Sequence, residues 1–396
     1  MQRKTRRHFI ETSLKAGITL PFLGTTLSSC DAEISNPAKT TTQEKEEKKP
    51  LSILILGGTS FLGPHQIAYA LERGHSVTTF TRGKTKPTIH QAVFKNVESL
   101  IGDREDNLEA LKGRKWDAVI DNSGRKLKWT EATAELLKDH VGLYVYTSST
   151  GVFYPYLGSD FKETDEVLLE EPTEIEDEDT KLEYWYGVMK ATSELAAQKA
   201  FGKDRTIVVR PTYMFGPGDK TDRFVHWPVR LSRGGEVLVP GKKEDAVQYI
   251  DVRDVAEWMI RLVEEKNTQT FNAVGPANPT GIYDFVKEAQ TAFDVESQLI
   301  AVTDYELLKE NGIHYIVPWI MPEGNNRGSA LINNDRAKAN GLTYRPLKQS
   351  IKDTYDWWYS DALTDERRKK FEEKEGSALL KEKELLEQWK SRVVTG

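Results

Sequence analysis

The sequence predicts an α/β fold, a doubly wound parallel sheet followed by a smaller C-terminal lobe. Short apolar runs without polar alternation recur from residue 51 onward, which is typical of strands buried on both faces. The first run, Leu51 to Leu56, leads into a glycine-rich turn and a helix. Alternation of such strands with helices indicates a parallel sheet covered on both faces, whose ligands bind beyond the strand C-termini.

The glycine-rich turn is suited to a phosphate group. Gly57 and Gly58 allow close approach of the backbone, and the N-H groups and dipole of the helix expected over 61–73 favour an anion. An ordinary strand-to-helix turn has the same composition, so the assignment depends on the segments that follow. The residues that we expect to contact a dinucleotide here are Gly57, Thr59, Ser60, Phe61, Leu62 and Gly63.

The later segments continue the alternation in chain order. We expect further strands at 76–81, 97–101, 116–120, 143–148, 206–210, 247–251 and 270–274. We expect helices at 105–111, 129–138 and 255–264. The segment from 160 to 183 is rich in Asp and Glu and offers little to pack, so it reads as an irregular surface loop.

The composition narrows the function classes. There are 55 basic and 61 acidic residues, a net charge of -6, which gives no basic footprint for a nucleic acid. Cys30 is the single cysteine, so an internal disulfide and a cysteine-based metal site are both excluded. The seven histidines show no metal-ligand spacing on a helix, and we expect no metal.

The N-terminus predicts export. Residues 5–10, Thr-Arg-Arg-His-Phe-Ile, resemble a twin-arginine signal, and Leu27-Ser28-Ser29-Cys30 resembles a bacterial lipobox. We therefore expect an export signal over 1–29, a lipid anchor on Cys30 and a flexible tether over 30–50, in the periplasm or cell envelope. The alternative is a disordered basic N-terminus on a cytoplasmic protein.

Several motifs together resemble the short-chain dehydrogenase/reductase superfamily, near its extended epimerase/dehydratase and atypical branches. They are Gly57–Gly63, Thr147–Ser149, Tyr186–Lys190, Val209–Pro211 and Tyr249–Ala256. The resemblance implies a Rossmann-type dinucleotide fold and a bound NAD(P). Ser60 stands where extended members usually carry a glycine, and this departure affects the inferred reaction more than the inferred binding.

The end of the second strand bears on the choice of cofactor. NAD-preferring folds place an acidic residue there, whereas this chain has Thr81 and Arg82. Arg82, together with Lys84 or Lys86, could pair with a 2′-phosphate, which favours NADP over NAD. A solvated loop arginine is the alternative.

The resemblance implies further cofactor contacts. Asp103 and Arg104 lie in the turn that contacts adenine in the family, and Asn122 and Ser123 follow the fourth strand where the nicotinamide ribose lies. Pro211 ends a strand beside them. Polar loop residues without a ligand would give the same pattern.

Catalysis is expected to depend on a tyrosine and a lysine one helical turn apart, on one helix face. Four pairs have this spacing: Tyr186/Lys190, Tyr283/Lys287, Tyr305/Lys309 and Tyr344/Lys348. Only the first follows the strand that ends in hydroxyl residues and precedes the next strand. Tyr186 is therefore the expected acid/base group, and Lys190 the charge that lowers its pKa and contacts the ribose.

Ser149 is the expected third member, polarising the substrate oxygen while a hydride passes between substrate carbon and nicotinamide. Ser148 and Thr150 remain candidates for that role, and strand-end capping is the alternative for all three.

The domain boundaries follow from these assignments. Residues 51–210 form mainly the NAD(P)-binding domain, 211–360 a smaller substrate lobe with returns to the main sheet, and 361–396 a charged helical tail that packs on the body or on a second subunit. Polar and aromatic groups near 221–227 suit a sugar-like substrate, and its expected contacts are Ser149, Arg223, Trp227 and Arg253.

An epimerase or dehydratase that returns the hydride within one turnover agrees best with export, because fresh NADPH is scarce outside the cytoplasm. The alternatives are a net NADP-dependent reductase or dehydrogenase and a non-catalytic nucleotide-binding module, since some atypical relatives associate with RNA.

Overall fold

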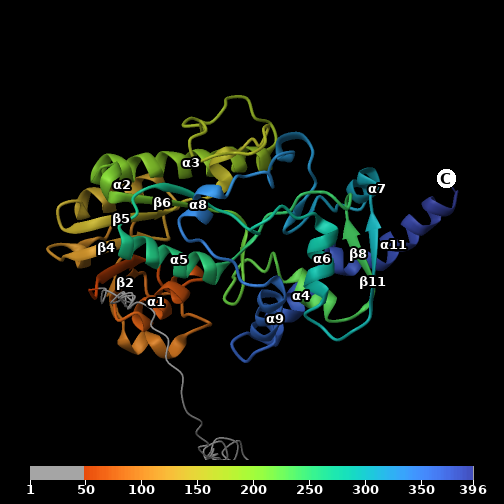
Figure 1. The fold of residues 1–396 in the computed structure, drawn as a ribbon, viewed down its shortest axis with the longest axis horizontal. Coiled ribbons are helices and arrows are strands. Elements are labelled where there is room, and N and C mark those ends of the chain that lie inside the picture. The colour runs from red at the N-terminus through yellow and green to blue at the C-terminus, as the bar shows by residue number, and fades with distance from the viewer. Residues whose placement is uncertain (1–48, 396) are drawn as a thin grey trace, which may run out of the picture. The chain divides into compact units, whose positions relative to one another are not determined.

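The central sheet within residues 49–395 is parallel and runs in the order β10-β6-β5-β4-β1-β2-β3 (Figure 1). Its strands are β1 (Ser52–Leu56), β2 (Ser76–Thr81), β3 (Glu98–Ile101), β4 (Trp116–Asp121), β5 (Val141–Thr147), β6 (Thr206–Pro211) and β10 (Thr270–Ala273). This computed structural model describes residues 49–395. The export signal, Cys30 and nearly all of the tether lie outside the described residues.

The predicted doubly wound α/β class is confirmed. The strand order runs outward from β1 in both directions, so the chain reverses its direction of winding between β1 and β4. Crevices at such a reversal, beyond the strand C-termini, are where open α/β sheets bind ligands.

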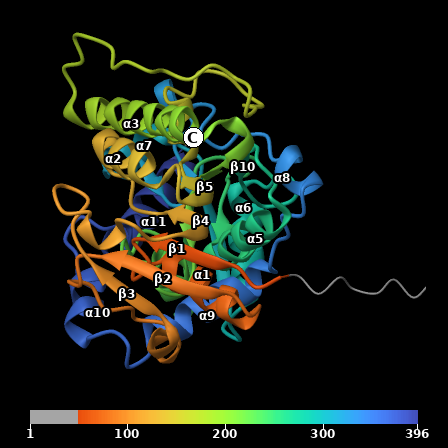
Figure 2. The same cartoon turned by 90° about the vertical axis from the view of Figure 1, so that its left-hand side faces the viewer.

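Helices cover both faces of the sheet, as Figures 1 and 2 show. Helices α1 (Leu62–Glu72) and α5 (Val252–Glu265) lie on one face, and α2 (Leu127–Leu137) and α3 (Glu178–Phe201) lie on the other. Ile53 to Leu56 of β1 are fully buried between these layers. The unbroken apolar run in the sequence therefore reflects burial on two sides.

One predicted helix of the sheet domain is wrong. Residues 105–111 contain only a short 3-10 turn, Glu109–Leu111. The backbone N-H of Asn107 donates to the carbonyl of Asp103 at 2.8 Å, and the N-H of Asp103 donates back to Asn107 at 2.9 Å. This reciprocal turn uses the groups that would begin a helix.

The second lobe is built on a small parallel pair, β8 (Gly235–Pro240) with β11 (Ser297–Val302). The expected strand at 247–251 is reduced to β9 (Ile250–Asp251), which pairs with β7 (Met214–Phe215). The other elements of this lobe are α4 (His226–Leu231), α6 (Ile282–Gln290), α7 (Tyr305–Glu310), β12 (Tyr315–Ile316), β13 (Trp319–Ile320) and α9 (Leu347–Trp358). Helix α8 (Asp335–Ala339) instead packs against β10 of the main sheet, with Ala337 in the core of that sheet.

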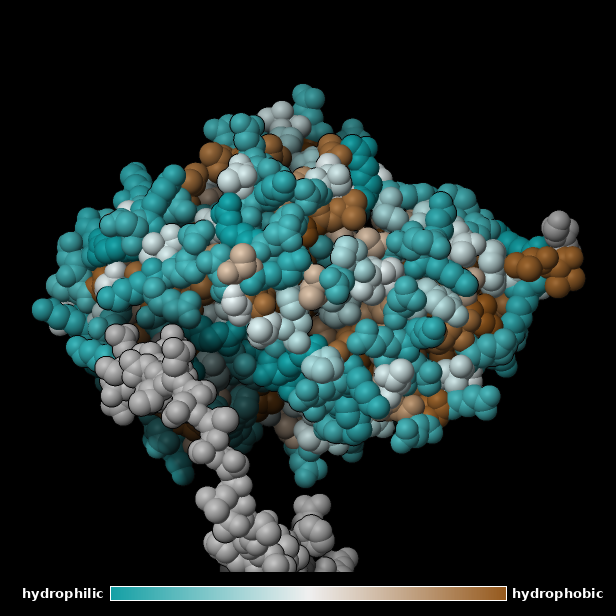
Figure 3. All heavy atoms as spheres, viewed as in Figure 1, coloured by the Kyte–Doolittle hydropathy of each residue, from teal (hydrophilic) through white to brown (hydrophobic). Residues whose placement is uncertain are grey.

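The C-terminal tail forms two helices, α10 (Asp365–Glu372) and α11 (Ala378–Thr395), separated by a turn in which Gly376 has φ of +74°. Leu385 and Leu386 of α11 are buried in the core of the second lobe. Figure 3 shows hydrophobic residues at the C-terminal end of α11, where Val394 is 87% exposed.

The acidic segment runs outside α3 in Figure 2, and its last residues belong to that helix. Asp177 caps α3 by accepting a hydrogen bond from the N-H of Thr180 at 2.7 Å. Between residues 49 and 395, no helix combines the length and apolar character needed to cross a bilayer.

Candidate active site

The turn after β1 leaves an unobstructed backbone surface for an anion. Gly57 has φ of +83°, and Phe61, with φ of 44°, begins α1 without a side-chain cap. No acidic residue lies in the first turn of α1. The positive dipole end of α1 is therefore open to a ligand such as a pyrophosphate, while the N-H of Gly63 donates to the carbonyl of Ser60 at 3.1 Å.

The turn is tightly packed from behind. A Cβ on Gly63 would lie 2.5 Å from the carbonyl oxygen of Gly58, and a Cβ on Gly58 would lie 2.6 Å from Thr79 Cγ2. Glycine is required at both positions, because α1 lies against the turn. Thr59, Ser60 and Phe61 are partly exposed, whereas Leu62 is buried. A glycine-rich turn in which added Cβ atoms would clash is typical of a dinucleotide-binding site, where the backbone must pack closely.

The ends of β1 and β4 meet at the reversal of the sheet. A Cβ on Gly57 would lie 2.8 Å from the Cβ of Ser123. Asn122, next to Ser123, donates to Gln66 of α1 at 2.6 Å and accepts from the Thr147 hydroxyl at 2.8 Å. The structure thus brings Asn122 and Ser123 to the glycine-rich turn.

Arg104 points into the protein, away from the surface that a nucleotide could reach. Its guanidinium pairs with the buried carboxylate of Asp121 and donates to Thr133 Oγ1 at 2.7 Å and to Ser123 Oγ at 3.2 Å. Burial works to raise the pKa of Asp121, but the charge of Arg104 together with hydrogen bonds from Arg104, Tyr144 and the Ser123 backbone outweighs burial and lowers that pKa. The predicted contact of Arg104 with adenine is therefore wrong. The buried guanidinium instead donates a hydrogen bond to the hydroxyl of Ser123 from the protein interior.

The other residues expected to contact the cofactor from these turns differ in whether their side chains already make hydrogen bonds within the protein. Asp103 accepts from the N-H of Glu105 at 3.0 Å and so caps its own turn. Thr81 Oγ1 accepts from the N-H of Gly83 at 3.1 Å. Arg82 is exposed.

The three hydroxyl residues after β5 have different partners. Ser148 donates to Glu194 at 2.5 Å, and Thr150 donates weakly to the carbonyl of Pro211 at 3.5 Å. Ser149 Oγ accepts from the N-H of Gly151 at 3.0 Å. Within the described chain, the Ser149 hydroxyl has no acceptor for its own proton, which leaves it available to a substrate oxygen.

Tyr186 and Lys190 lie on the face of α3 that packs against this strand end. A Cβ on Gly151 would lie 2.9 Å from Cε1 of Tyr186, and a Cβ on Gly187 would lie 2.5 Å from the Gly151 carbonyl. These two glycines let α3 approach until the Tyr186 ring rests on the segment that begins with Ser149. The structure therefore brings the predicted tyrosine and serine to one place.

Lys190 is buried and fixed. Its Nζ donates to the carbonyl of Thr147 at 2.9 Å and lies 5.1 Å from the ring centre of Tyr146 and 6.0 Å from that of Tyr186. Burial works to lower the pKa of Lys190, but Tyr146, Tyr186 and Asp121 outweigh it and hold the pKa above its usual value. Lys190 therefore holds a buried positive charge on the same side of α3 as the Tyr186 ring.

The other three tyrosine–lysine pairs lie elsewhere. Tyr305 donates to Asp245 at 2.7 Å, and Tyr344 donates to the carbonyl of Val274 at 2.8 Å. The Nζ of Lys243 lies 4.6 Å from the centre of the Tyr283 ring. None of these hydroxyls lies at the end of β5.

An aromatic group near Tyr186 was missed by the sequence reasoning. Tyr154 packs edge-on against Tyr156 at 5.7 Å and against Tyr184 at 4.8 Å. Burial raises the pKa of Tyr213 to about 12; the charge of Arg223 opposes this rise, and Tyr186 adds to it. The sequence signal for Tyr154, Tyr156 and Tyr213 is their position after β5 or β6, whereas Tyr184 lies within α3 and has no such signal.

Of the residues expected to contact the substrate in the second lobe, one is exposed, whereas the other two are buried or held in ion pairs. Arg223 is exposed and stacks over Tyr213 at 5.3 Å. Trp227 is fully buried in the core of the second lobe and donates to the carbonyl of Val317 at 2.9 Å. Arg253 is held in ion pairs by Asp251 and Asp353. A substrate contact by Trp227 is therefore wrong, and Arg253 has a structural role.

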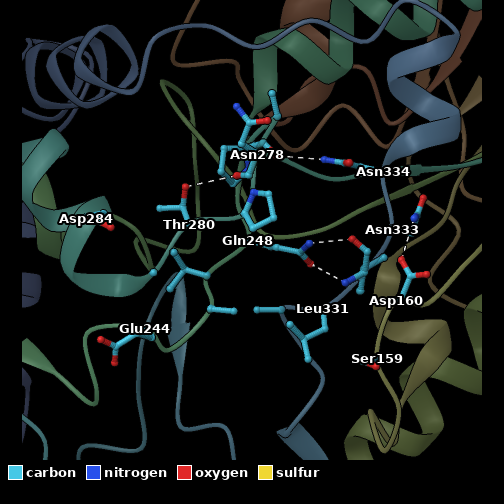
Figure 4. Close-up of a pocket in the computed structure, with 18 of the residues that line it drawn as sticks. Ser159, Asp160, Glu244, Gln248, Asn278, Thr280, Asp284, Leu331, Asn333 and Asn334 are labelled. Atoms are coloured by element: carbon cyan, nitrogen blue, oxygen red, sulfur yellow. Dashed lines mark hydrogen bonds between the residues drawn. The ribbon is translucent and has the colours of Figure 1, made fainter.

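A separate cavity of about 800 Å³ opens beside α6 and contains none of the predicted site residues (Figure 4). Two of its polar side chains already have partners: Gln248 bonds both ways to Ile332 at 2.8 and 3.1 Å, and Asn334 donates to two carbonyls. Among the described residues, no group of three His, Cys, Asp or Glu side chains could hold a metal ion.

Comparison with protein families gives one match. The model of the NAD dependent epimerase/dehydratase family matches residues 53–274. A similar curated protein is the chloroplast stem-loop binding protein of 41 kDa b from Arabidopsis thaliana, 31% identical over 246 residues, 58% of this chain and 59% of the relative. The Dictyostelium discoideum sterol-4-alpha-carboxylate 3-dehydrogenase, decarboxylating, is 28% identical over 187 residues, 42% of this chain and 55% of the relative. The chain thus spans less than two thirds of these two relatives.

Solved structures share the fold. The Bordetella bronchiseptica enzyme WbmH in complex with NAD+ has a TM-score of 0.57 at 15% identity and covers 80% of this chain and 100% of its own. The UDP-N-acetylglucosamine 4-epimerase from Methanobrevibacter ruminantium M1 has a TM-score of 0.57 at 16% identity, covering 78% and 98%. At these identities the likeness concerns the fold alone.

Proposed function

Since the chain belongs to the NAD dependent epimerase/dehydratase family, we propose that it is an NAD(P)-dependent enzyme that epimerises or dehydrates a sugar-like or polyhydroxylated substrate. The observation that carries the proposal is the placement of Tyr186 on the Gly151 backbone, beside Ser149 and the buried charge of Lys190. The fold supports it, because these groups lie at the carboxyl edge of the sheet, next to the glycine-rich turn.

The roles follow from the contacts. Tyr186 takes the proton from a substrate hydroxyl and later returns it, while Lys190 stabilises the phenolate. Ser149 donates a hydrogen bond to the same substrate oxygen. A bound nicotinamide supplies the hydride acceptor, and the glycine-rich turn with Asn122 and Ser123 holds the dinucleotide. Return of the hydride within one turnover gives epimerisation or elimination without net redox change.

We propose NADP as the preferred nucleotide. The end of β2 carries no carboxylate that could accept from ribose hydroxyls, and the exposed Arg82 follows Thr81 there. A guanidinium at this position suits a 2′-phosphate.

The chemistry is tested by Tyr186→Phe. We expect hydride transfer to fall by about 100-fold or more while NAD(P) affinity changes by less than about twofold, since only the acid/base group is lost. Bound reduced nicotinamide is followed by fluorescence with UDP-N-acetylglucosamine and UDP-glucuronic acid as probes. Tyr283→Phe, from another pair of the same spacing, is the matched control. Equal rates in wild type and Tyr186→Phe would remove the assignment.

A nucleotide-binding module without catalysis is the second candidate, because the Arabidopsis relative is named for binding a stem-loop. The net charge of -6 opposes RNA binding, and the complete Ser149, Tyr186 and Lys190 set favours an enzyme.

Export and lipid anchoring are also part of the proposal. The support is sequence evidence: the paired arginines, and the single cysteine, Cys30, at the end of a lipobox-like segment. We expect Cys30→Ser to move the protein from the membrane fraction to the soluble fraction of the native cell envelope, because a lipid chain anchors by its buried methylenes. An unchanged distribution of the variant would contradict the anchor.

A further inference from the structure

Gln66 is a buried polar residue in the helix that follows the glycine-rich turn. It lies three residues after Gly63 and is 0% exposed. Buried amides persist where both their donor and their acceptor have partners. The partners of the Gln66 amide connect this residue to other parts of the site, which an apolar side chain at the same position could not do.

A line of hydrogen bonds connects Gln66 to Lys190. Lys190 Nζ donates to the Thr147 carbonyl at 2.9 Å, and the Thr147 hydroxyl donates to Asn122 Oδ1 at 2.8 Å. Asn122 Nδ2 donates to Gln66 Oε1 at 2.6 Å, and Gln66 Nε2 donates to Met259 Sδ at 3.3 Å. The first bond ends on the backbone carbonyl of Thr147 and the second starts from the hydroxyl of the same residue, so these two are linked covalently through Thr147. From that hydroxyl onward, each hydrogen bond runs in the same direction.

This directionality fixes both amides. Each amide oxygen accepts from the previous residue and each amide nitrogen donates to the next, so reversing either amide would place two donors or two acceptors together. Hydrogen bonds arranged head to tail strengthen one another in a low dielectric. The line connects residues of α3, β5, α1 and α5 through Asn122, which follows β4, and so joins the helix of Lys190 to the helix that follows the phosphate-binding turn.

We infer that Gln66 is a positioning residue that acts on nucleotide binding through Lys190, by way of Asn122 and Thr147. The inference rests on the proposed function in one respect, that the site binds NAD(P). Without the Gln66 carbonyl, Asn122 loses the acceptor that orients its amide. The Thr147 segment then loses its side-chain bond, and the carbonyl that holds Lys190 is freer to move.

Simple support of α1 is the competing explanation, and it makes a different prediction. If Gln66 only stabilises α1, its loss should weaken nucleotide binding equally with or without the lysine. If it acts through Lys190, its loss should have little effect once the lysine side chain is apolar.

The experiment is a double-mutant cycle on the full chain, with NAD+ and NADP+ affinities measured by isothermal titration calorimetry. The proteins are wild type, Gln66→Met, Lys190→Met and the double variant. Methionine is unbranched and of similar length, so no large cavity is created. Thr130→Val is the control, because Thr130 is buried near the same strand end and its hydroxyl has no partner among the described residues. Melting temperatures identify any variant that fails to fold.

We expect Gln66→Met to weaken nucleotide binding by about tenfold in the wild-type background and by less than about twofold in the Lys190→Met background. Thr130→Val should change it by less than about twofold. An equal loss in both backgrounds, or no loss in either, would overturn the inference and leave the proposed function standing. A folded wild type that binds neither nucleotide would instead overturn the proposed function.

Discussion

At the residue scale, the site depends on two glycines that carry no chemistry. Gly151 and Gly187 allow α3 to approach the end of β5 until the Tyr186 ring touches backbone. The sequence predicts Tyr186 and Lys190 from their order along the chain, and Ser149 from the resemblance to the family's hydroxyl-rich strand end. It did not identify the glycines, because their requirement appears only when the two segments are packed.

Gly151→Ala tests this contact. The added methyl would lie 2.9 Å from the Tyr186 ring, so the ring must move away from Ser149. We expect turnover to fall by about tenfold to 100-fold, with a loss of about 1–3 kcal/mol in the free energy of unfolding from overpacking. Steady-state kinetics and urea denaturation give the two values. Full activity in a destabilised variant would show that the ring position is not critical.

Side-chain direction was the least predictable feature at this scale. Arg104 and Trp227 were expected at ligand surfaces, but Arg104 pairs with the buried Asp121 and Trp227 lies in the core of the second lobe. Both are amphipathic side chains that suit a core as well as a binding site. Only the three-dimensional neighbours distinguish the two roles.

At the element scale, the central strands β1, β4, β5 and β6 could be predicted closely because each contains an apolar run that is buried on both faces. The helix predicted over 105–111 does not form, because the reciprocal hydrogen bonds between Asp103 and Asn107 compete with it. The pair β8 and β11 was not anticipated, because its partners lie far apart in the sequence. Local periodicity carries no information about such a pairing.

The start of α3 offers a test at this scale. Asp177 accepts from the N-H of Thr180, and Glu178 and Asp179 add negative charge to the first turn. We expect Asp177→Ala to cost about 1 kcal/mol in the free energy of unfolding, because a capped N-H loses its acceptor. Asp177→Asn is the control, since its amide oxygen can still cap. Urea denaturation that gives both variants the same loss would contradict a capping role.

At the scale of the whole molecule, two buried histidines connect stability to acidity. Burial lowers the pKa of His226 from 6.5 to about 3, and burial lowers that of His65 from 6.5 to about 4. Both rings are neutral in the folded protein at a pH where the unfolded chain takes up protons. The contribution of these two histidines to stability is therefore fully present above about pH 6.5 and is lost as the pH falls from there towards 4 for His65 and towards 3 for His226.

His226→Gln should reduce this dependence. His226 alone accounts for up to about 5 kcal/mol of the loss once the pH has fallen to about 3, and glutamine has no proton to gain. We expect a flatter plot of unfolding free energy against pH between about 6.5 and 5, whatever the change in stability at neutral pH. Chemical denaturation across this range supplies the plot. Identical slopes for variant and wild type would mean that His226 does not titrate on unfolding.

The most direct test of the central claim is mass spectrometry of the nucleotide released when protein purified from its native cell envelope is denatured. The account predicts NADP(H), or otherwise NAD(H), at close to one molecule per chain, held by the glycine-rich turn and retained through closed hydride cycles. NADP(H) would also support the role of Arg82. Absence of any dinucleotide, together with no calorimetric binding of NAD+ or NADP+ by the folded protein, would contradict the account.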